Sequence, residues 1–469
     1  MSSALHLGQK LPHAPLFMPA VCLAAGIALG PLPWSSWVSI VVLAMLVVMT
    51  ILLQRFPKVQ WTGIGLCFVM LGIVISPGKK QQVTDGIWTE AVVVSTPLQK
   101  ENTMMTQLLF VATGEQRHCY LWPKSDSSRL EVGQGIRICL DRRYYASQNH
   151  WQRCDSITAQ LSALQRLRVR ALCWRAVVLE RLSRHGTDND ARAVVAAMTV
   201  GDKSGLSRSL RQAYASAGTS HVLALSGLHL SVIYMLLTMF TLRRKRFWVG
   251  QVSVVLAIWS FALITGLSPS VVRAATMITV YSLFALGGRR HSPLGVLSFT
   301  ALLMLMVSPG VLFDVGFQLS FTSMMGILLF MPLFENLMPW LFQRAAWPLR
   351  FVGGLMAVSV AAQMGTAPLV AYHFGQLPLW FILSNIIIVP LATLLLYAAV
   401  LTLIIPQLGF MLMWIASLLN AVTNRMANLP MASITGLHPT PLQVALLYVA
   451  IVTLWLLLLL YTPNRRLRC

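Results

Sequence analysis

Acidic residues are scarce in this chain, which has 14 Asp and Glu among 469 residues, against 36 Lys and Arg. All charged residues together make up 11% of the chain, whereas soluble globular proteins carry about 25%. Hydrophobic residues make up 56%, and the mean hydropathy is +0.69. This balance excludes a soluble protein and indicates a polytopic membrane protein.

Several signals of catalysis and cofactor binding are also missing from the sequence. No His-x-His-x-Asp-His cluster occurs, and the two histidines at 221 and 229 have no Cys, Asp or Glu nearby that would complete a metal site. Val200–Gly205 lacks the second glycine that precedes the lysine of a phosphate-binding P-loop. The first apolar run has no small-x-small cleavage site, so it is not a cleavable signal peptide. We therefore expect no metal, no cofactor and no nucleotide site.

Long apolar runs predict the transmembrane architecture. A helix needs about 20 apolar residues to cross a bilayer. The sequence has about 12 such runs, which we place at 16–33, 36–54, 61–76, 221–240, 247–266, 270–287, 292–308, 315–333, 351–371, 378–404, 407–424 and 442–461. The predicted fold is thus a polytopic α-helical membrane protein of about 12 spans.

The basic residues of the short loops predict its orientation, because cytoplasmic loops are enriched in Lys and Arg. With 12 spans, nearly all of them fall on one side: Lys10, Arg55, Lys58, Arg243, Arg244, Lys245, Arg246, Arg289, Arg290, Arg344, Arg350, Arg465, Arg466 and Arg468. Arg425 is the exception. We expect an inner-membrane protein with both termini in the cytoplasm and residues 77–220 in the periplasm.

The external segment divides into a strand-rich part and a helical part. β-Branched and aromatic residues separated by turn signals predict strands near 90–95, 105–112, 117–122, 136–140 and 153–159. Five short strands suit a small β-barrel of the OB type. A basic amphipathic helix follows at 160–185, with shorter helices at 188–200 and 207–217. The predicted divisions are residues 1–76 (about three membrane helices), 77–160 (OB-like domain), 161–220 (linking helices) and 221–469 (channel domain).

Aromatic and basic residues in the strand-rich part are candidates for binding a single nucleic-acid strand, which stacks on aromatic rings and follows basic grooves. The candidates are Tyr120, Trp122, Arg142, Arg143, Tyr144, Tyr145, Trp151 and Arg153. The alternative is that the aromatics belong to the core and the arginines to a solvated rim. A periplasmic location also permits a disulfide, for which we favour a pair among Cys119, Cys139 and Cys154 over free buried thiols.

The segment His221-Val-Leu-Ala-Leu-Ser-Gly-Leu-His229 opens the fourth predicted span with an unusual number of polar groups. Polar residues at membrane depth are costly, so a helix that carries several usually turns them toward other helices or a water-filled route. Other spans contribute further polar residues. The candidate pathway residues are His221, Ser226, Gly227, His229, Arg273, Asp314, Gln318, Gln363, Thr366 and Asn385.

Each of these residues has a plainer interpretation. Arg273 can extend its charge to the membrane surface, and it can also pair with Asp314, since both lie toward the outside. The small and polar residues also suit ordinary helix packing. Ser226 and His229 lie three residues apart, which is compatible with a serine hydrolase dyad, but no oxyanion donor is identifiable. We favour polar groups that shape a translocation route and assign no catalytic residue.

Four segments resemble the ComEC competence channels in the same order along the chain. They are His221–His229, Pro309–Phe321 (PGVLFDVGFQLSF), Gln363–Phe374 (QMGTAPLVAYHF) and Leu383–Leu391 (LSNIIIVPL). The strand-rich segment resembles that family's external OB-like domain. Many members continue into a metallo-β-lactamase-like domain. The chain ends at Cys469 without the metal cluster of that domain, so we expect a form without nuclease activity.

The resemblance implies a function and a set of partners. The expected function is an inner-membrane channel for uptake of single-stranded DNA during natural transformation. Single-stranded DNA and the lipid bilayer are the implied contacts, together with a periplasmic DNA-receptor protein, a cytoplasmic ATP-driven translocase and a second copy of the chain. A small-molecule or lipid transporter and an intramembrane serine hydrolase remain the alternatives.

Overall fold

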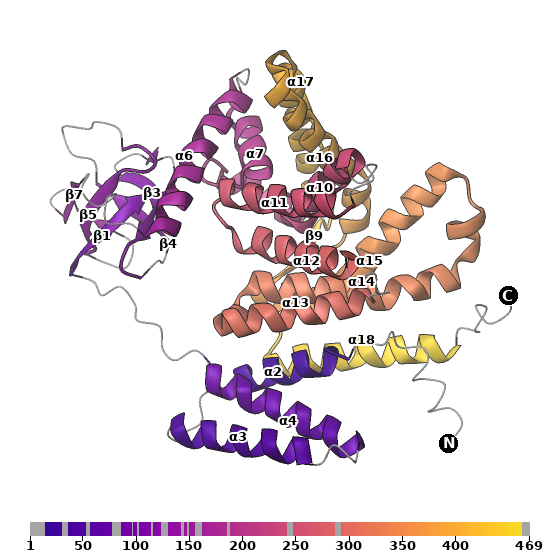
Figure 1. The fold of residues 1–469 in the computed structure, drawn as a ribbon. Coiled ribbons are helices and arrows are strands. Elements are labelled where there is room, and N and C mark those ends of the chain that lie inside the picture. The colour runs from indigo at the N-terminus through magenta and orange to yellow at the C-terminus, as the bar shows by residue number, and fades with distance from the viewer. Residues whose placement is uncertain are drawn as a thin grey trace.

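The computed structural model shows a mainly helical protein with a small β domain inserted after the first three helices (Figure 1). It describes residues 15–461 apart from 31–35, 53–56, 77–85, 96, 101–102, 114–115, 123–129, 142–144, 148–149, 155–161, 185–187, 242–246 and 287–291.

Six helices in these residues are long and apolar enough to cross a membrane: α12 (Pro269–Leu286), α14 (Val315–Leu337), α15 (Trp347–Phe374), α16 (Phe381–Ile404), α17 (Gly409–Ala427) and α18 (Pro441–Tyr461). Six shorter apolar helices accompany them: α2 (Phe17–Leu29), α3 (Ser36–Leu52), α4 (Pro57–Ile75), α10 (Gly227–Thr241), α11 (Phe247–Ile264) and α13 (Pro293–Val307). Short turns of helix at Pro309–Phe313, Trp340–Arg344 and Pro406–Leu408 join some of them. The polytopic membrane class predicted from composition is confirmed.

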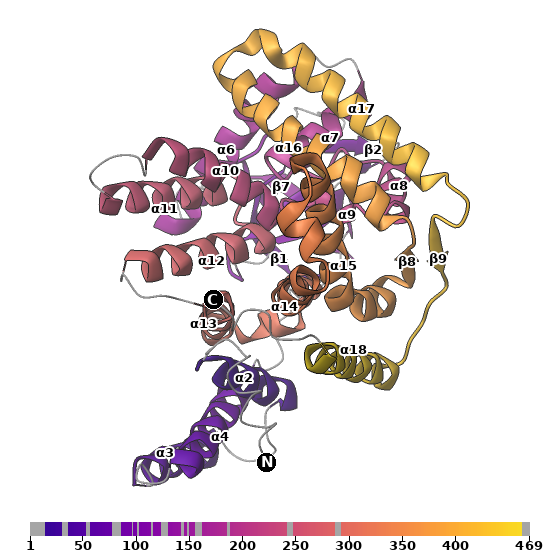
Figure 2. The same cartoon turned by 90° about the vertical axis from the view of Figure 1, so that its right-hand side faces the viewer.

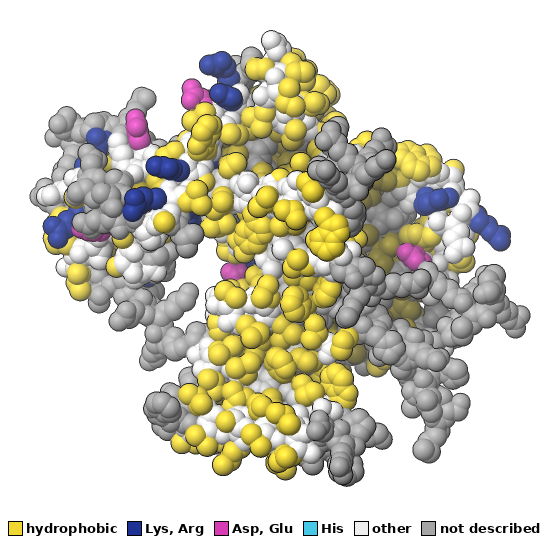
Figure 3. All heavy atoms as spheres, viewed as in Figure 1, with side chains coloured by type: hydrophobic (Ala, Val, Ile, Leu, Met, Phe, Trp, Pro, Cys, Tyr) yellow, Lys and Arg dark blue, Asp and Glu magenta, His cyan; other side chains and the backbone are white. Residues whose placement is uncertain are grey.

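The surface supports the same class. Figure 3 shows hydrophobic side chains over the helical part of the molecule, whereas Lys and Arg gather over the β domain and α6 on one side and at the opposite edge. Helix α18 is the most exposed of the long apolar helices, because only 6% of its apolar stretch is buried inside the protein. Large apolar side chains that face outward all along a helix fit a hydrocarbon environment better than water.

The β domain is one sheet of seven strands: β1 (Trp88–Val93), β2 (Leu98–Lys100), β3 (Thr103–Phe110), β4 (Gln116–Leu121), β5 (Gly135–Cys139), β6 (Tyr145–Ala146) and β7 (Trp151–Arg153). The strand order is β6-β4-β3-β1-β5-β7, and β2 pairs with β3. Strands β4 and β6 run parallel, whereas the other neighbouring strands of this sheet run antiparallel. Alternate residues of the strands, such as Val93, Phe110, Cys119 and Ile138, meet in one buried cluster. This alternation is what a sheet with one buried face requires.

Helix α6 (Ala163–Ser183) joins the β domain to the membrane helices. Ser162 and Gln165 form a capping box at its start. One face packs Val169 and Leu172 against the sheet. On another face, Arg168 Nη2 donates to the Gly266 carbonyl at 3.1 Å, between α11 and α12. The predicted basic helix is thus a connector between the two parts.

Three short helices complete the connection: α7 (Asn189–Thr199), α8 (Arg208–Ser216) and α9 (Ser220–Leu223). Nearly every residue of α7 is buried, because the helix packs into the cluster that α16 and α17 form. Tyr214 of α8 is fully buried, and its hydroxyl donates to Asn420 Oδ1 of α17 at 3.0 Å. A two-stranded sheet, β8 (Gln376–Pro378) with β9 (Ser433–Thr435), ties the segment after α15 to the one after α17.

One predicted helix is wrong. The sequence pattern favours a continuous span over 221–240, but the structure breaks it into α9 and α10, with extended backbone at Ala224. Leu225, between the two helices, is buried against Gly201, where a Cβ would lie 2.6 Å from Leu225 Cδ1. Hydropathy could not detect the break, because the packing partner lies 24 residues earlier in the chain.

Candidate functional site

The predicted pathway residues lie mainly on five helices that pack in a closed ring. Helix α10 contacts α12, α12 contacts α14, α14 contacts α15, α15 contacts α16, and α16 returns to α10. Figure 2 views the molecule from the side away from the β domain, with α10 and α12 running across the view and α14 seen more nearly end on. The ring brings together polar residues that are more than 150 positions apart in the sequence.

Ser226 and His229 form a helix cap at the start of α10. Ser226 precedes the first helical residue, Gly227, which is exposed. The Ser226 backbone N–H donates to His229 Nδ1 at 3.1 Å, and Ser226 Oγ lies 2.9 Å from the same nitrogen. Since Nδ1 accepts from a backbone N–H, the hydroxyl must donate to it too, and the proton of the neutral ring sits on Nε2. The side chain of His229 thus accepts from the backbone N–H that precedes the helix, which is one half of a capping box.

His229 is completely buried, whereas His221 on α9 is exposed. His229 Nε2 has no hydrogen-bond partner within the described residues. A serine–histidine dyad needs a third group that orients the base, and no such group contacts Nε2 there. The geometry of this segment fits a rigid, buried polar constriction better than a nucleophile.

Arg273 of α12 and Asp314 form an ion pair across the ring. Arg273 Nη1 lies 3.5 Å from Asp314 Oδ1, and the arginine side chain is 7% exposed while the aspartate is 46% exposed. Asp314 also caps α14 by accepting from the Phe317 N–H at 2.8 Å. A Cβ on Gly316 would lie 3.2 Å from Arg273 Nη2, so the glycine leaves room for the guanidinium. The predicted pairing of Arg273 with Asp314 is present.

Gln318 connects α14 to α15 through His373, which was not among the predicted pathway residues. Its Nε2 donates to the Leu312 carbonyl at 3.0 Å, and its Oε1 lies 3.1 Å from His373 Nε2. His373 is exposed near the end of α15. His373 lies ten residues after Gln363 in the segment Gln363–Phe374, so the sequence did contain a signal for it.

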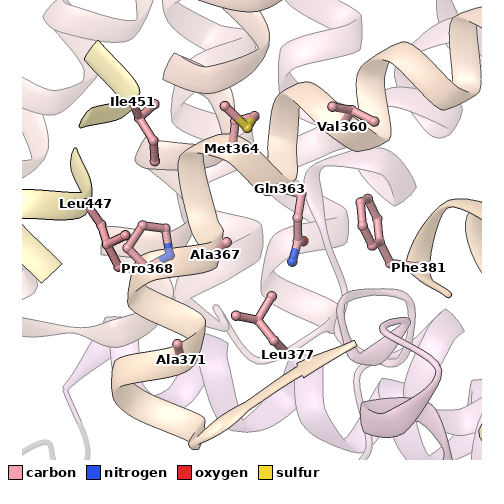
Figure 4. Close-up of a pocket in the computed structure, with 10 residues that line it drawn as sticks. All are labelled: Val360, Gln363, Met364, Ala367, Pro368, Ala371, Leu377, Phe381, Leu447 and Ile451. Atoms are coloured by element: carbon pink, nitrogen blue, oxygen red, sulfur yellow. The ribbon is translucent and has the colours of Figure 1, made fainter. Parts of the chain in front are cut away.

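Gln363 points into an apolar cavity of about 270 Å³ beside α15 (Figure 4). The cavity lies between α15, Leu377 of β8, Phe381 at the start of α16, and Leu447 and Ile451 of α18. Gln363 Nε2 is buried without a partner among the described residues. Thr366, one turn further on, donates to the Ala362 carbonyl of its own helix at 3.0 Å, so its hydroxyl is satisfied locally.

Asn385 holds α16 against α15. Its Nδ2 donates to Ser359 Oγ at 3.2 Å, and Ser359 was not among the predicted residues. Its Oδ1 is buried and has no partner within the described chain. Helix-to-helix hydrogen bonds between polar side chains are common in membrane bundles and contribute about 0.6 kcal/mol on average. Sequence pattern alone could not pair Ser359 with Asn385, because the pairing depends on how the two helices dock.

Four ring helices thus bury a polar atom that has no partner in the described part of the chain. Among them are His229 Nε2 on α10, Arg273 Nε on α12, Gln363 Nε2 on α15 and Asn385 Oδ1 on α16, whereas Arg273 Nη1 has only its ion pair with Asp314. Native proteins pair most buried polar groups, and inside a membrane an unpaired one is especially costly. Further buried atoms without a hydrogen-bond partner among the described residues lie outside the ring, on Arg168, Gln251, Ser268 and Asn420.

The candidate DNA-binding residues of the β domain divide into exposed and buried ones. Tyr120 and Tyr145 face each other on β4 and β6, and their rings stack with centroids 5.1 Å apart. Tyr145 and Trp122 are exposed, and so is Arg153. Trp151 is a correction: it is 6% exposed, lies in the core of the domain and donates from Nε1 to the Trp122 carbonyl. Arg142, Arg143 and Tyr144 lie outside the described residues.

The suggested disulfide is a second correction, since Cys119, Cys139 and Cys154 are free thiols in the structure. Cys119 faces the core of the β domain, whereas Cys139 follows inward-facing Ile138 and so points to the opposite side. Cys154 donates its N–H to the carbonyl of Gly135, four residues from Cys139 on β5, which corresponds to about 13 Å. Cα atoms in a disulfide are usually about 4.4–6.8 Å apart, so Cys139 and Cys154 are too far apart to bond.

Comparison with known proteins gives matches mainly in the membrane part. A family model described as Competence protein matches residues 198–461. ComE operon protein 3 of Bacillus subtilis (strain 168) is 27% identical over 324 residues, which cover 66% of this chain and 40% of that protein. An uncharacterized protein of Aquifex aeolicus (strain VF5) is 28% identical over 261 residues, which cover 55% of this chain and 56% of that protein.

The chain therefore aligns with only about half of the length of these curated relatives. No solved structure matches it. The matched region contains the complete ring from α10 to α16, and with it every predicted pathway residue. Because the family model covers more than half of the chain, this protein belongs to the competence protein family of the ComEC type.

Proposed function

We propose that the protein is an inner-membrane channel that takes up single-stranded DNA during natural transformation. The observation that carries the proposal is the closed ring of α10, α12, α14, α15 and α16, four of whose helices bury an unpartnered polar atom. The region that matches the competence family contains this whole ring. A polyanion needs polar and cationic groups along its route, and Arg273 supplies a buried cation.

The β domain is proposed to be an OB-like barrel that presents the strand to the membrane. Its pairing order runs from β6 to β7, and only residues 147–150 separate these two strands in the sequence. β6 pairs with β4 and β7 with β5, so two strands that are close in the sequence lie at the two ends of the pairing order. This supports a closed five-stranded arrangement, counting β2 as an extension beside β3. The Tyr120–Tyr145 stack offers an aromatic platform for bases.

The orientation follows from charge. Twelve spans, both termini in the cytoplasm and residues 77–220 in the periplasm agree with the basic residues of the short loops. Arg344 and Arg350, which follow α14, then face the cytoplasm, opposite to the β domain. A periplasmic DNA receptor, an ATP-driven translocase in the cytoplasm and a second copy of the chain are the proposed partners.

Within the ring, the two polar centres have different proposed roles. The Ser226–His229 cap is a rigid constriction, since two hydrogen bonds fix the imidazole. The Arg273–Asp314 pair is longer than a charge-assisted hydrogen bond and is exposed at the carboxylate, so a passing phosphate can exchange with Asp314 as the partner of Arg273. Neither centre requires a catalytic step.

The test is DNA uptake in cells that carry the wild type, His229→Ala or Arg273→Ala at matched membrane abundance. We expect each substitution to lower uptake at least tenfold. Arg344→Ala, which removes an exposed arginine near the opposite edge, is the matched control and should leave uptake within about twofold. Normal uptake with both ring variants would contradict the assignment of the pathway.

A further inference from the structure

Lys203 and Arg211 are neighbours beside the β domain, and the positive charge of Arg211 also acts on His118 of β4. His118 is exposed on β4, Lys203 lies exposed in the loop between α7 and α8, and Arg211 is exposed on α8. Arg211 Nη2 donates to the Lys203 carbonyl at 2.8 Å, which holds the two residues side by side. His118 Nε2 lies 2.7 Å from Gln107 Nε2 of the neighbouring strand. None of the three was selected from the sequence.

The neighbouring carboxylate does not neutralise this cluster. Asp202 directs Oδ2 toward Arg175 Nη2 at 3.1 Å, and its Oδ1 accepts from the Ser204 N–H and hydroxyl at 3.1 and 2.6 Å. Both of its oxygens are therefore occupied by partners in its own loop and in α6. Among the described residues, no carboxylate lies within ion-pair distance of Lys203 or Arg211.

The electrostatics agree with this geometry. Partial desolvation by the surrounding protein lowers the pKa of Lys203, although its side chain still reaches solvent, and the positive charge of Arg211 lowers it further. Burial also lowers the pKa of His118, again with a contribution from Arg211, which the charge of Asp202 only partly offsets. Lys203 and His118 thus both respond to the positive charge of Arg211, which is the situation that a bound anion relieves.

We infer that Lys203, Arg211 and His118 form a phosphate-binding niche that receives the backbone of single-stranded DNA between the β domain and the ring of membrane helices. The inference rests on the proposed function and names a contact site for its substrate. The shared chemistry is a phosphodiester anion, and the position of the niche favours the DNA backbone over a lipid headgroup as its source.

The niche lies between the tyrosine stack of the β domain and the start of α10. On one side, His118 and Tyr120 are two residues apart on β4 and project from the same face, about 7 Å apart. The Tyr120–Tyr145 stack therefore continues directly into the niche. On the other side, Gly201 packs against Leu225, the residue before Ser226 at the entrance of α10. A strand whose bases stack on the tyrosines would reach the ring across Lys203 and Arg211.

The expected effect can be measured as a salt dependence. For single strands, each phosphate contact contributes about 0.7 to the slope of log K against log salt concentration. Removing both charges should lower the slope by about 1.4, which corresponds to roughly 25-fold weaker binding at 0.1 M salt. Substitutions that only disturb packing would change affinity without changing the slope.

The experiment uses the full-length protein in nanodiscs of zwitterionic lipid and a fluorescein-labelled oligothymidine. Fluorescence anisotropy measures binding between 50 and 200 mM salt for wild type, K203Q/R211Q and the charge-conserving K203R/R211K. The control R344Q/R350Q removes two arginines from the opposite edge of the protein. We expect the smaller slope only in K203Q/R211Q, with K203R/R211K and the control close to wild type.

The outcomes separate this inference from the proposed function. If the wild type binds DNA and K203Q/R211Q keeps its slope, the niche is refuted while the channel stands. If the wild type does not bind the oligothymidine at 50 mM salt, both the niche and the proposed DNA channel are refuted. A second set of nanodiscs with anionic lipid tests the lipid source. If wild type retains more anionic lipid than K203Q/R211Q while their DNA slopes are equal, the niche holds lipid headgroups and the DNA assignment is wrong.

Discussion

Removing the charge of Asp202 should release α6, and with it the β domain, from the membrane part of the protein. Asp202 and Arg175 form an ion pair at 3.1 Å, with side chains only 7% and 11% exposed. Breaking a buried pair by removing one partner costs about 3–5 kcal/mol, because the remaining charge stays buried and uncompensated. Asp202→Asn keeps the shape of the side chain, so the loss of stability measures the contribution of the negative charge.

Hydrogen–deuterium exchange followed by mass spectrometry measures this loss locally. If α6 opens by losing this contact, 3 kcal/mol corresponds to exchange of its amides that is more than 100-fold faster. Asp141→Asn is the matched control, since it removes one partner of an exposed Asp141–His150 pair, which contributes about 1 kcal/mol at most. Exchange of α6 in Asp202→Asn within threefold of wild type would refute the reasoning.

The same ion pair predicts a pH dependence. Burial raises the pKa of Asp202, but Arg175 and the two hydrogen bonds from Ser204 outweigh it, so the pKa lies below its ordinary value. A carboxyl group with a lowered pKa in the folded state stabilises the protein above the unfolded pKa of about 3.9. That stabilisation is lost as pH falls through the folded pKa. The double variant R175M/D202L should be more stable than either single loss of charge, because it leaves no unpaired ion.

Three further predictions concern other parts of the structure. Gly365→Ala should destabilise the protein by about 1–3 kcal/mol in thermal unfolding, since the new Cβ would lie 2.1 Å from a carbonyl oxygen of α14; Gly354→Ala, with open space around it, is the control, and equal stability of the two would contradict the close packing. Ser226→Ala should lose only about 0.5–1.5 kcal/mol of helix capping and keep most DNA uptake, because the backbone N–H still holds His229; complete loss of uptake with normal membrane abundance would favour a nucleophile instead. Binding of single-stranded DNA should strengthen as pH falls from 7 to 5, because protonated His118 attracts phosphate, and His118→Gln should lose this component; an identical pH profile in both proteins would remove His118 from the niche.

Much of the candidate ring could be predicted from the sequence, since polar residues are conspicuous in apolar runs. Arg273 and Asp314 were expected to pair because both lie toward the outer side, and they do so at 3.5 Å. His373 and Ser359, the partners of Gln318 and Asn385, were missed. A polar residue in a span is visible in the sequence, but its partner depends on the docking of two helices.

By itself, the sequence determined the membrane class, the strand-rich external segment and the polar residues of the spans. These features follow from local patterns: the length of apolar runs, short segments of β-branched and aromatic residues between turns, and the chemistry of single residues. The buried position of Trp151 illustrates the limit, because an aromatic residue in a short strand suits a core and a binding surface equally well.

Only the tertiary structure decided the break between α9 and α10, the closure of the helix ring and the charge interaction of Arg211 with His118. The first two depend on contacts between segments far apart in the chain, such as Gly201 with Leu225 or α10 with α16. Such contacts arise when the helices dock onto one another and the β domain docks through α6 onto the membrane helices. No local pattern encodes that docking, because its free energy is shared among many weak contacts and a few buried charges.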